Sequence, residues 1–324
     1  MKRILVTGAA GQIGSDLVPV LRSKYGDSNV VAAGYVDPLS VEIQDSGPCT
    51  SIDVTRLSQI DAAIKKFDID SLFHLGSILS ASAEENRTRA HHVNIDGLFN
   101  VLEASVCNKL QVVVTPSSIA AFGPEASGDK VPNDTIQRPI SNYGISKVFG
   151  ELMGNYYSLK LGMDVRGVRL PGLVSWKTEP TSGTTDYAVA IFYAAIRENS
   201  YCCYLRPDTS LPIMYMPDAI EALIGVAEAD EVRLEHHADF NVNSMSFTPE
   251  ELAEAIRLRL PGFTMEYEID PLRQSIADSW PNSLDDSAAR KEWDWNPQYD
   301  LPSMVDDMLE NLGRKLASEP VSMD

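Results

Sequence analysis

The amino-acid sequence predicts an α/β fold built on a doubly wound parallel sheet. Short apolar runs alternate with longer amphipathic stretches from the first residues to about residue 172. Parallel strands that are buried on both faces are nearly continuous apolar runs, and helices must connect them. After residue 172 the alternation loosens, and helices mix with short strands. We therefore expect one domain over residues 1–172 and a smaller mixed α/β lobe over residues 173–324, some of which can return to the first domain.

A glycine-spaced turn separates the first apolar run, residues 4–6, from a helix expected over residues 15–25. The spacing G-x-x-G-x-x-G puts Gly8 at the tight turn, Gly11 where the backbone approaches a ligand, and Gly14 where the helix packs closely on the strand. Unpaired N–H groups at the start of the helix would hold a diphosphate. Without a strand before it and a helix after it, such a triplet predicts only a tight turn. The candidate residues of this Rossmann-type cofactor site are Gly8, Gly11, Gln12, Ile13 and Gly14.

The second expected strand, residues 30–34, bears on the choice of cofactor. In this fold an acid after the second strand binds the ribose hydroxyls of NAD, and the nearest acid here is Asp37, about 20 residues beyond the glycines. No Arg or Lys lies between Tyr25 and Arg56 to hold the 2′-phosphate of NADP. The sequence therefore favours NAD. The alternative for Asp37 is an ordinary turn residue before Pro38.

The elements that follow supply further candidates for the cofactor site. A short strand over residues 51–54 leads into a helix, and its acid, Asp53, either contacts the adenine amino group or caps that helix. The next strand, residues 71–77, ends in small residues that permit close approach of a cofactor. A long helix over residues 90–108 contains Asn94, which either joins the site or is an exposed helix residue. The further cofactor candidates are Asp53, Val54, Leu75, Gly76, Ser77, Asn94 and Leu173.

Three side chains suited to alcohol oxidation are expected on the next strand and helix. The strand over residues 111–118 ends in Ser118, and the helix that begins at residue 142 carries Tyr143 and Lys147. Tyr143 and Lys147 are about one helical turn apart and share a face, and the strand end opens toward the same crevice. A nearby ammonium favours phenolate, so Tyr143 can accept the proton of a substrate hydroxyl while Ser118 holds that hydroxyl and Lys147 holds the nicotinamide ribose. By itself, Y-x-x-x-K more often marks an ordinary surface helix.

The C-terminal half is expected to be mixed in structure. A strand over residues 165–169 precedes a polar loop over residues 176–186, and a helix follows over residues 187–199. Another helix opens at Pro217. Residues 248–251 read Thr-Pro-Glu-Glu, a helix start with threonine as N-cap, proline at the first position and glutamate at the third.

Composition and charge exclude several classes of partner. The 324 residues include 46 acidic and 27 basic side chains, and the formal net charge of −19 disfavours nucleic acid and anionic membranes. No apolar run of about 18 residues exists, so no membrane span is expected. No targeting segment fits before the first strand, which predicts a cytoplasmic protein. The four cysteines are expected to be reduced thiols, and the adjacent histidine pairs lack metal-ligand spacing, so no metal site is expected.

These motifs resemble those of a known superfamily. The glycine triplet, Ser118, Tyr143 and Lys147 together resemble the extended short-chain dehydrogenases/reductases, which include nucleotide-sugar epimerases, dehydratases and reductases. Within that group, segments of the C-terminal half are similar to the short-chain-type L-threonine 3-dehydrogenases, and the similarity runs from residue 4 to about residue 312. Those segments are R-L-P-G at 169–172, G-T-T-D-Y-A at 183–188, L-P-I-M-Y-M-P-D at 211–218, F-T-P-E-E-L at 247–252 and S-W-P-N-S-L-D-D-S at 279–287.

The resemblance implies NAD-dependent oxidation of the β-hydroxyl of L-threonine to L-2-amino-3-ketobutyrate by a metal-free homodimer. Residues 1–172 would form the NAD-binding domain, and residues 173–324 would mainly bind substrate. The family carries an acid directly after the second strand where this chain has Gly34, so Asp37 would have to act from the loop. The alternatives are a nucleotide-sugar epimerase or dehydratase and a non-catalytic NAD sensor. The implied substrate residues are Ser80, Ser118, Tyr143, Thr184, Thr185, Asp186 and Trp280, although Trp280 also fits a core position.

Overall fold

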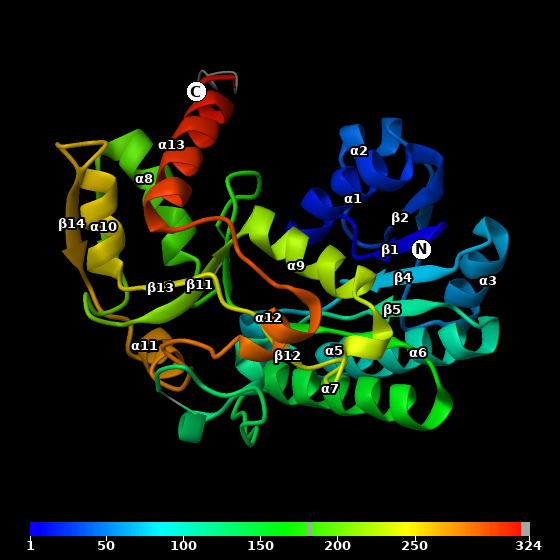
Figure 1. The fold of residues 1–324 in the computed structure, drawn as a ribbon. Coiled ribbons are helices and arrows are strands. Elements are labelled where there is room, and N and C mark those ends of the chain that lie inside the picture. Colours follow the sequence, from blue (N-terminus) through cyan, green and yellow to red (C-terminus); the bar gives the residue numbers. More distant parts are fainter. Residues whose placement is uncertain (127, 181–182, 319–324) are drawn as a thin grey trace.

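The computed structural model describes residues 1–126, 128–180 and 183–318, and over these residues it confirms the α/β fold (Figure 1). A six-stranded parallel sheet has the order β3-β2-β1-β4-β5-β7 within this described chain. Its strands are β1 (Ile4–Thr7), β2 (Val30–Gly34), β3 (Cys49–Ser51), β4 (Ser71–His74), β5 (Val112–Val114) and β7 (Val165–Arg166). The helices of this half are α1 (Gln12–Tyr25), α2 (Val41–Asp45), α3 (Leu57–Phe67), α4 (Ser80–Glu85), α5 (Arg87–His91), α6 (Gly97–Asn108) and α7 (Asn142–Leu161).

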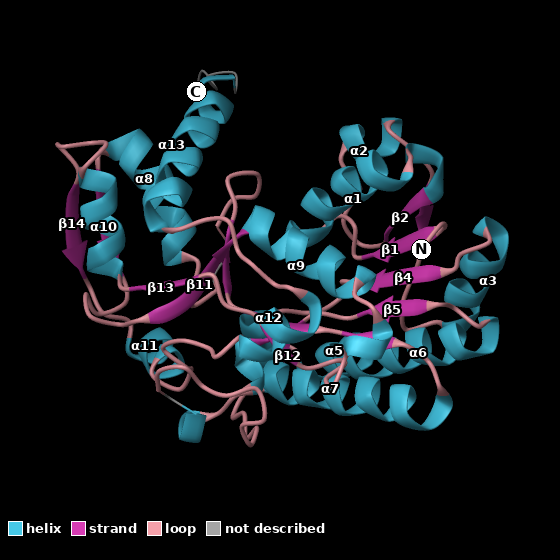
Figure 2. Cartoon of the chain, in the orientation of Figure 1, coloured by secondary structure: helices cyan, strands magenta, loops and turns pink. Residues whose placement is uncertain are grey.

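The apolar runs form central strands because both faces of the sheet are covered by helices (Figure 2). On one face, Val6 and Phe73 belong to the same buried cluster as Leu17 and Leu21 of α1. On the other face, Leu5 is buried in a cluster with side chains of α3, α6 and α7. An alternating polar pattern would expose one face to water, so the continuous runs fit the observed layers.

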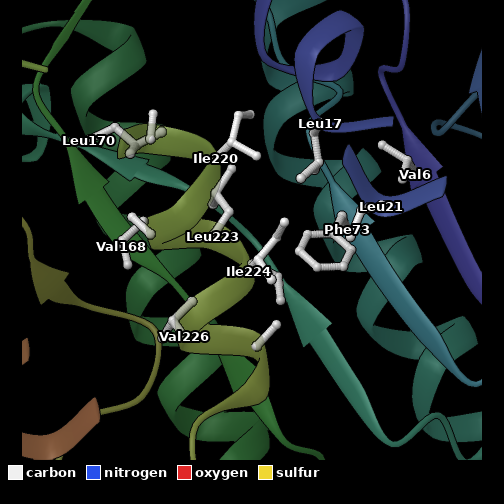
Figure 3. Packing of buried hydrophobic residues seen from close by; sticks show 14 of the residues in the cluster. Val6, Leu17, Leu21, Phe73, Val168, Leu170, Ile220, Leu223, Ile224 and Val226 are labelled. Atoms are coloured by element: carbon white, nitrogen blue, oxygen red, sulfur yellow. The ribbon is translucent and has the colours of Figure 1, made fainter. Parts of the chain in front are cut away.

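The first face is completed by a helix from the C-terminal half. Helix α9 (Met216–Glu228) packs against α1, β5 and β8 (Val168–Leu170). Its side chains Ile220 and Ile224 enter the cluster that contains Leu17 and Phe73, as Figure 3 shows. The chain after residue 173 therefore contributes to the core of the N-terminal sheet.

Two strands that the sequence predicts as continuous are interrupted in the structure. The expected strand 111–118 divides into β5 and β6 (Ser117–Ser118), because Pro116 between them has no N–H to donate to a neighbouring strand. The expected strand 165–169 divides at Gly167 into β7 and β8. A Cβ at Gly167 would lie 2.5 Å from the Thr115 carbonyl oxygen. The segments after β5 and after β7 therefore leave the large sheet at the same place. There β6 and β8 form a smaller parallel sheet with β12 (Phe240–Asn241).

The C-terminal lobe is a mixture of short strands and helices, as expected. Its strands are β9 (Gly172–Val174), β11 (Leu211–Tyr215) and β13 (Met245–Phe247) in one sheet and β10 (Ser200–Cys203) and β14 (Thr264–Tyr267) in another. Its remaining helices are α8 (Tyr187–Glu198), α10 (Pro249–Arg257), α11 (Pro271–Ala277), α12 (Ser287–Trp293) and α13 (Leu301–Ser318). The predicted start of α10 is confirmed as a capping box between Thr248 and Glu251. No helix in the described ranges is long and apolar enough to cross a membrane.

Candidate active site

The glycine turn after β1 has the geometry of a dinucleotide site. Gly8 has a φ of +71°, which favours glycine, and a Cβ there would lie 2.7 Å from the Gly76 amide nitrogen. A Cβ at Gly14 would lie 2.5 Å from the Gly8 carbonyl oxygen. Gly14 therefore allows α1 to pack on the turn itself rather than on the strand, and Gly8 brings the turn against the residues that follow β4.

The N-terminus of α1 has space and backbone N–H donors for an anion. Gly11 is its N-cap, and no side chain of the described residues caps it. A Cβ at Gly11 would meet the Gly8 carbonyl oxygen at 3.3 Å, and no other atom of the described chain within 4 Å. The amides of Gln12 and Ile13 lie in the first turn, at the positive end of the helix. This cradle fits the diphosphate of a dinucleotide. The expected start of the helix at residue 15 is thus three residues late.

The loop after β2 contains a tyrosine, Tyr35, that contacts the candidate residue Asp53 and that the sequence did not indicate. The backbone after β2 folds over Gly34, where a Cβ would lie 3.3 Å from the Asp37 carbonyl oxygen. Asp37 is exposed in this loop. Asp53 accepts hydrogen bonds from the Thr55 amide at 3.0 Å and hydroxyl at 2.7 Å, and the Tyr35 phenol also donates to it. Burial opposes ionisation, but these hydrogen bonds lower the pKa of the Asp53 carboxyl.

Asn94 fixes the segment that follows β4. It lies in a π-helical turn, His92–Asp96, between α5 and α6, and such turns are frequent at functional sites. Its side chain accepts from the Ile78 amide at 2.7 Å and donates to the Ile78 carbonyl at 2.9 Å. Ser77 donates to the same amide oxygen at 3.2 Å. Asn94 is buried, so the alternative of an exposed helix residue is wrong, and α4 begins directly after this segment at Ser80.

Val54, Leu75 and Gly76 line the same part of the sheet edge. A Cβ at Gly76 would lie 3.7 Å from the Cγ1 methyl group of Val54. A Cβ at Gly97 would lie 2.9 Å from the Cγ2 methyl group of the same valine. The Leu75 amide donates to the Thr7 carbonyl at 3.1 Å. The structure thus gathers the expected residues after β1, β3 and β4 at the carboxyl ends of the strands.

Lys147 of α7 is held by a contact with the segment that follows β5. Its ammonium donates to the Pro116 carbonyl at 2.9 Å and lies 5.2 Å from the centre of the Tyr143 ring. A buried neighbour, His74, shares a 2.8 Å hydrogen bond with the Thr7 hydroxyl. Burial, and then the charge of Lys147, lower the pKa of His74 to about 3, so this imidazole is neutral. A polar cavity of about 30 Å³ is lined by Lys147, His74 and Asn94.

Ser118 and Tyr143 lie on neighbouring elements because α7 begins against the turn that follows Ser118. The Ser118 hydroxyl accepts from the Ala120 amide at 3.2 Å. A Cβ at Gly144 would lie 2.2 Å from the Ala120 carbonyl oxygen, so only glycine lets α7 start this close. Ser141 caps the helix by accepting from the Gly144 amide at 3.1 Å. The three predicted side chains therefore stand on two elements that are packed together.

A buried ion pair connects α7 to the strands next to Ser118. Arg169 and Glu151 are each 3% exposed and meet at 2.8 Å. Glu151 also accepts from Ser117 and from Gln137, and Arg169 donates to the Asn133 carbonyl. The pair joins α7 to β6, β8 and the 123–141 loop. The sequence signal for this pair is a charged residue inside an otherwise apolar strand or helix, because such residues are rarely buried unless they are paired.

The expected substrate segment lies against the carboxyl end of β8 and the start of β9. Ser118 pairs with Leu170 in the β6–β8 register, and two residues further on a Cβ at Gly172 would lie 2.7 Å from Thr185. Leu173 follows on β9. Thr184 is buried, and Thr185 and Asp186 are half-buried. Residues 181 and 182 of the expected 176–186 loop lie outside the described residues.

Trp280 links the two halves of the candidate site. It is partly buried, and it packs against the cluster that contains Ile119 and Phe122 as well as against the core of the C-terminal lobe. It therefore stands between the turn after Ser118 and the lobe that carries Thr185. Among the described residues, no group of three His, Cys, Asp or Glu side chains could hold a metal ion.

Comparison with known proteins defines the class. The model of the NAD dependent epimerase/dehydratase family matches residues 4–242, and the chain belongs to this family. An uncharacterised epimerase/dehydratase of Staphylococcus saprophyticus is 46% identical over 319 residues, which cover 98% of this chain and 99% of the relative.

The similar solved structures are more specific. The L-threonine dehydrogenase of Clostridium difficile has a TM-score of 0.95 and 47% identity, covering 97% of this chain and 98% of that one. The holo form of a GalE-like L-threonine dehydrogenase from Cupriavidus necator has a TM-score of 0.92 and 44% identity, covering 96% and 99%. The resemblance stated from the sequence is thus confirmed, and the cofactor is NAD, which the glycine cradle fits.

Proposed function

We propose that this protein oxidises the β-hydroxyl of L-threonine to L-2-amino-3-ketobutyrate, with NAD as acceptor. The observation that carries the proposal is the short path from Ser118 to Thr185: the register pairs Ser118 with Leu170, and Gly172 touches Thr185. We infer from this path that the alcohol-oxidising trio and the Thr-Thr-Asp turn contact the same small molecule. The similarity to L-threonine dehydrogenases over nearly the whole chain supports the same substrate.

The proposed chemistry divides three tasks among three side chains. The Lys147 ammonium, anchored on the Pro116 carbonyl and 5.2 Å from the centre of the Tyr143 ring, is assigned to the nicotinamide ribose. Tyr143 takes the proton of the substrate hydroxyl, and Ser118 hydrogen-bonds the substrate oxygen. The glycine cradle at the start of α1 would hold NAD, whose nicotinamide would supply the acceptor for the hydride from the substrate's β-carbon. The candidate cofactor contacts remain those derived from the sequence, including Asp37 from its exposed loop.

Recognition of a free amino acid needs groups for both of its charges. We assign the substrate ammonium to the Asp186 carboxylate, because opposite charges attract strongly in a site screened from water. The substrate carboxylate is assigned to hydroxyl and N–H donors around Ser80, Thr184 and Thr185. Trp280 would close the pocket over the methyl group.

The proposed assembly is a homodimer formed through α6 and α7. Exposed apolar side chains follow one face of α7 at helical spacing, with Leu152 62% and Leu159 74% exposed. A contiguous exposed apolar face of this kind marks an interaction surface. The side chains of this α6–α7 face are Phe99, Ile145, Leu152, Tyr156 and Leu159. We also propose the cytoplasm as the compartment, because all four cysteines are free thiols.

A nucleotide-sugar epimerase or dehydratase is the second candidate, since the family includes such enzymes. It would need a diphosphate contact in the C-terminal lobe, for which Arg206 is the candidate. Arg206 already donates to Asp278 at 2.9 and 3.1 Å and lies 3.5 Å from Asp208. These carboxylates oppose a second anion there, which favours the amino acid.

The deciding experiment measures NADH formation with NAD and a panel of hydroxy amino acids. L-threonine should be oxidised faster than serine, and absence of NADH above background at alkaline pH would reject the proposal. Thermal-shift measurements with NAD present, comparing L-threonine with nucleotide sugars, separate the two candidates. Stabilisation by a nucleotide sugar alone would favour the epimerase or dehydratase.

A further inference from the structure

Tyr204 holds the backbone of the candidate substrate turn. It follows β10, and its phenol donates to the Gly183 carbonyl at 3.0 Å, with the Thr184 carbonyl oxygen at 3.3 Å. The next two residues, Thr185 and Asp186, are the ones that we assign to the substrate. The phenol therefore contacts the turn through backbone carbonyl oxygens.

The Tyr204 ring is itself fixed on two sides. The Arg273 guanidinium lies over it, 4.2 Å from the ring centre, close enough for a cation–π interaction. Tyr187 meets the ring edge-on at a centroid distance of 6.4 Å. The backbone is fixed as well, because the Asp270 amide donates to the Tyr204 carbonyl at 3.0 Å and the Asp270 carboxylate caps α11, which carries Arg273.

The turn is thus held from two opposite directions. Gly172 makes room for Thr185, while Tyr204 holds the carbonyls before it. Within the turn, the Asp186 amide donates to the Gly183 carbonyl at 3.2 Å, and α8 begins directly afterwards. Burial raises the pKa of the Tyr204 phenol, so it remains a donor at the alkaline pH of a dehydrogenase assay.

We propose that Tyr204, with its ring held beneath Arg273, is a positioning residue that sets the affinity of the 183–186 turn for the amino-acid substrate. This inference rests on the proposed function. The clamp acts on the substrate side alone, because its contacts are to the turn, to α8 and to α11. It should therefore change the KM for L-threonine and leave the KM for NAD unchanged.

The test compares Tyr204→Phe with Tyr201→Phe, which removes another partly buried phenol, from the strand β10 just before Tyr204. Tyr204→Phe keeps the ring and its contact with Arg273 but removes the hydrogen bond. We expect the KM for L-threonine to rise about three- to tenfold, the range for loss of one hydrogen bond, with kcat changed less than about twofold. Tyr201→Phe should match the wild type. An unchanged KM for L-threonine, or an equal rise in the KM for NAD, overturns the proposal.

Variants of Arg273 test the other half of the clamp. Arg273→Met removes the cation over the ring and should raise the KM for L-threonine in the same direction, whereas Arg273→Lys keeps a cation and should restore most of the affinity. If Arg273→Met has the wild-type KM, the cation has no part in the clamp and the proposal is wrong as stated.

A measurement without substrate separates this inference from the proposed function. Amide hydrogen exchange of Asp186 and Ala188 should be faster in Tyr204→Phe than in wild type and Tyr201→Phe. If the wild type does not oxidise L-threonine, the proposed function fails, and exchange alone decides whether the clamp exists. Equal exchange in all three proteins overturns the clamp.

Discussion

A Cβ on Gly172 would lie 2.7 Å from the Thr185 methyl carbon and 2.8 Å from the terminal methyl of Ile213. Real atoms do not approach this closely without a shift, and neither neighbour is the end of a long flexible side chain. Gly172 is therefore the residue that allows the Thr185 turn to rest on β9. The R-L-P-G segment connects this contact to Ser118 through the register of β8.

The substitution Gly172→Ala should displace the Thr185 turn. We expect a higher KM for L-threonine and a loss of about 1–3 kcal/mol in the free energy of unfolding, as is usual for overpacking. Enzyme kinetics and chemical denaturation measure both. The control is Gly313→Ala in α13, where a Cβ meets no atom of the described chain within 4 Å. That variant should keep its activity and gain about 0.5–1 kcal/mol from helix propensity. A wild-type KM in Gly172→Ala would contradict the assignment of Thr185.

The fold could be predicted largely because its strongest signals are local. Apolar runs between helical stretches indicated the order of the main strands, and the glycine spacing indicated the first turn. The interruptions at Pro116 and Gly167 were missed, because each lies inside a segment that was predicted as one continuous strand. The missing N–H of Pro116 was the available signal for the first interruption. A glycine inside a strand was the signal for the second, where Gly167 leaves room for the Thr115 carbonyl oxygen.

The parts of the site that were not predicted depend on contacts between distant segments. Tyr204 and Arg273 carry no motif, and their roles follow only from the contact between the Tyr204 ring and the Arg273 guanidinium of α11. The same holds for Asp16 of α1, which pairs at 2.7 Å with Lys177 beyond β9. Tyr35 was overlooked because the acidic partner it contacts, Asp53, comes from a different strand.

Tyr143→Phe should abolish nearly all turnover with little change in NAD binding. The variant keeps the ring and removes the group that accepts the proton, and loss of a general base costs about 10²–10⁴-fold. Steady-state kinetics measure turnover, and the quenching of protein fluorescence during a titration with NAD measures cofactor binding. Lys147→Met should impair both turnover and NAD binding, because we assign Lys147 to the cofactor ribose as well. A Tyr143→Phe protein that retains half its rate would rule out the proton-transfer role.

The oligomeric state tests the α6–α7 face. Leu159→Glu places a charge on that face and should convert a dimer into a monomer, because burying an unpaired carboxylate is costly. Light scattering coupled to size-exclusion chromatography gives the mass directly. Leu258→Glu is the matched control, since Leu258 is 77% exposed and lies at the end of α10. A wild-type protein that is monomeric at all concentrations would contradict the proposed homodimer.

Two histidines should give the stability opposite dependences on pH. The pKa of His74 is lowered to about 3 by burial, so below the unfolded pKa of about 6.5 the unfolded state takes up a proton that the folded state refuses. The protonation of His74 in the unfolded state therefore lowers the free energy of unfolding as the pH falls from about 7.5 to about 5, on either side of the unfolded pKa of about 6.5.

His236 acts in the reverse sense. Burial opposes its charge, but its 2.7 Å contact with Glu292 and nearby acids raise the pKa of His236 above 6.5. Its contribution is fully present below the unfolded pKa and is lost as the pH rises through the folded pKa. Because the two effects overlap, each is measured as a difference between wild type and one variant. The free energy of unfolding of wild type minus that of His236→Gln should fall as the pH rises. The same difference taken with His74→Gln should rise with pH. The same sign for both differences would show that one of these histidines does not titrate as its surroundings indicate.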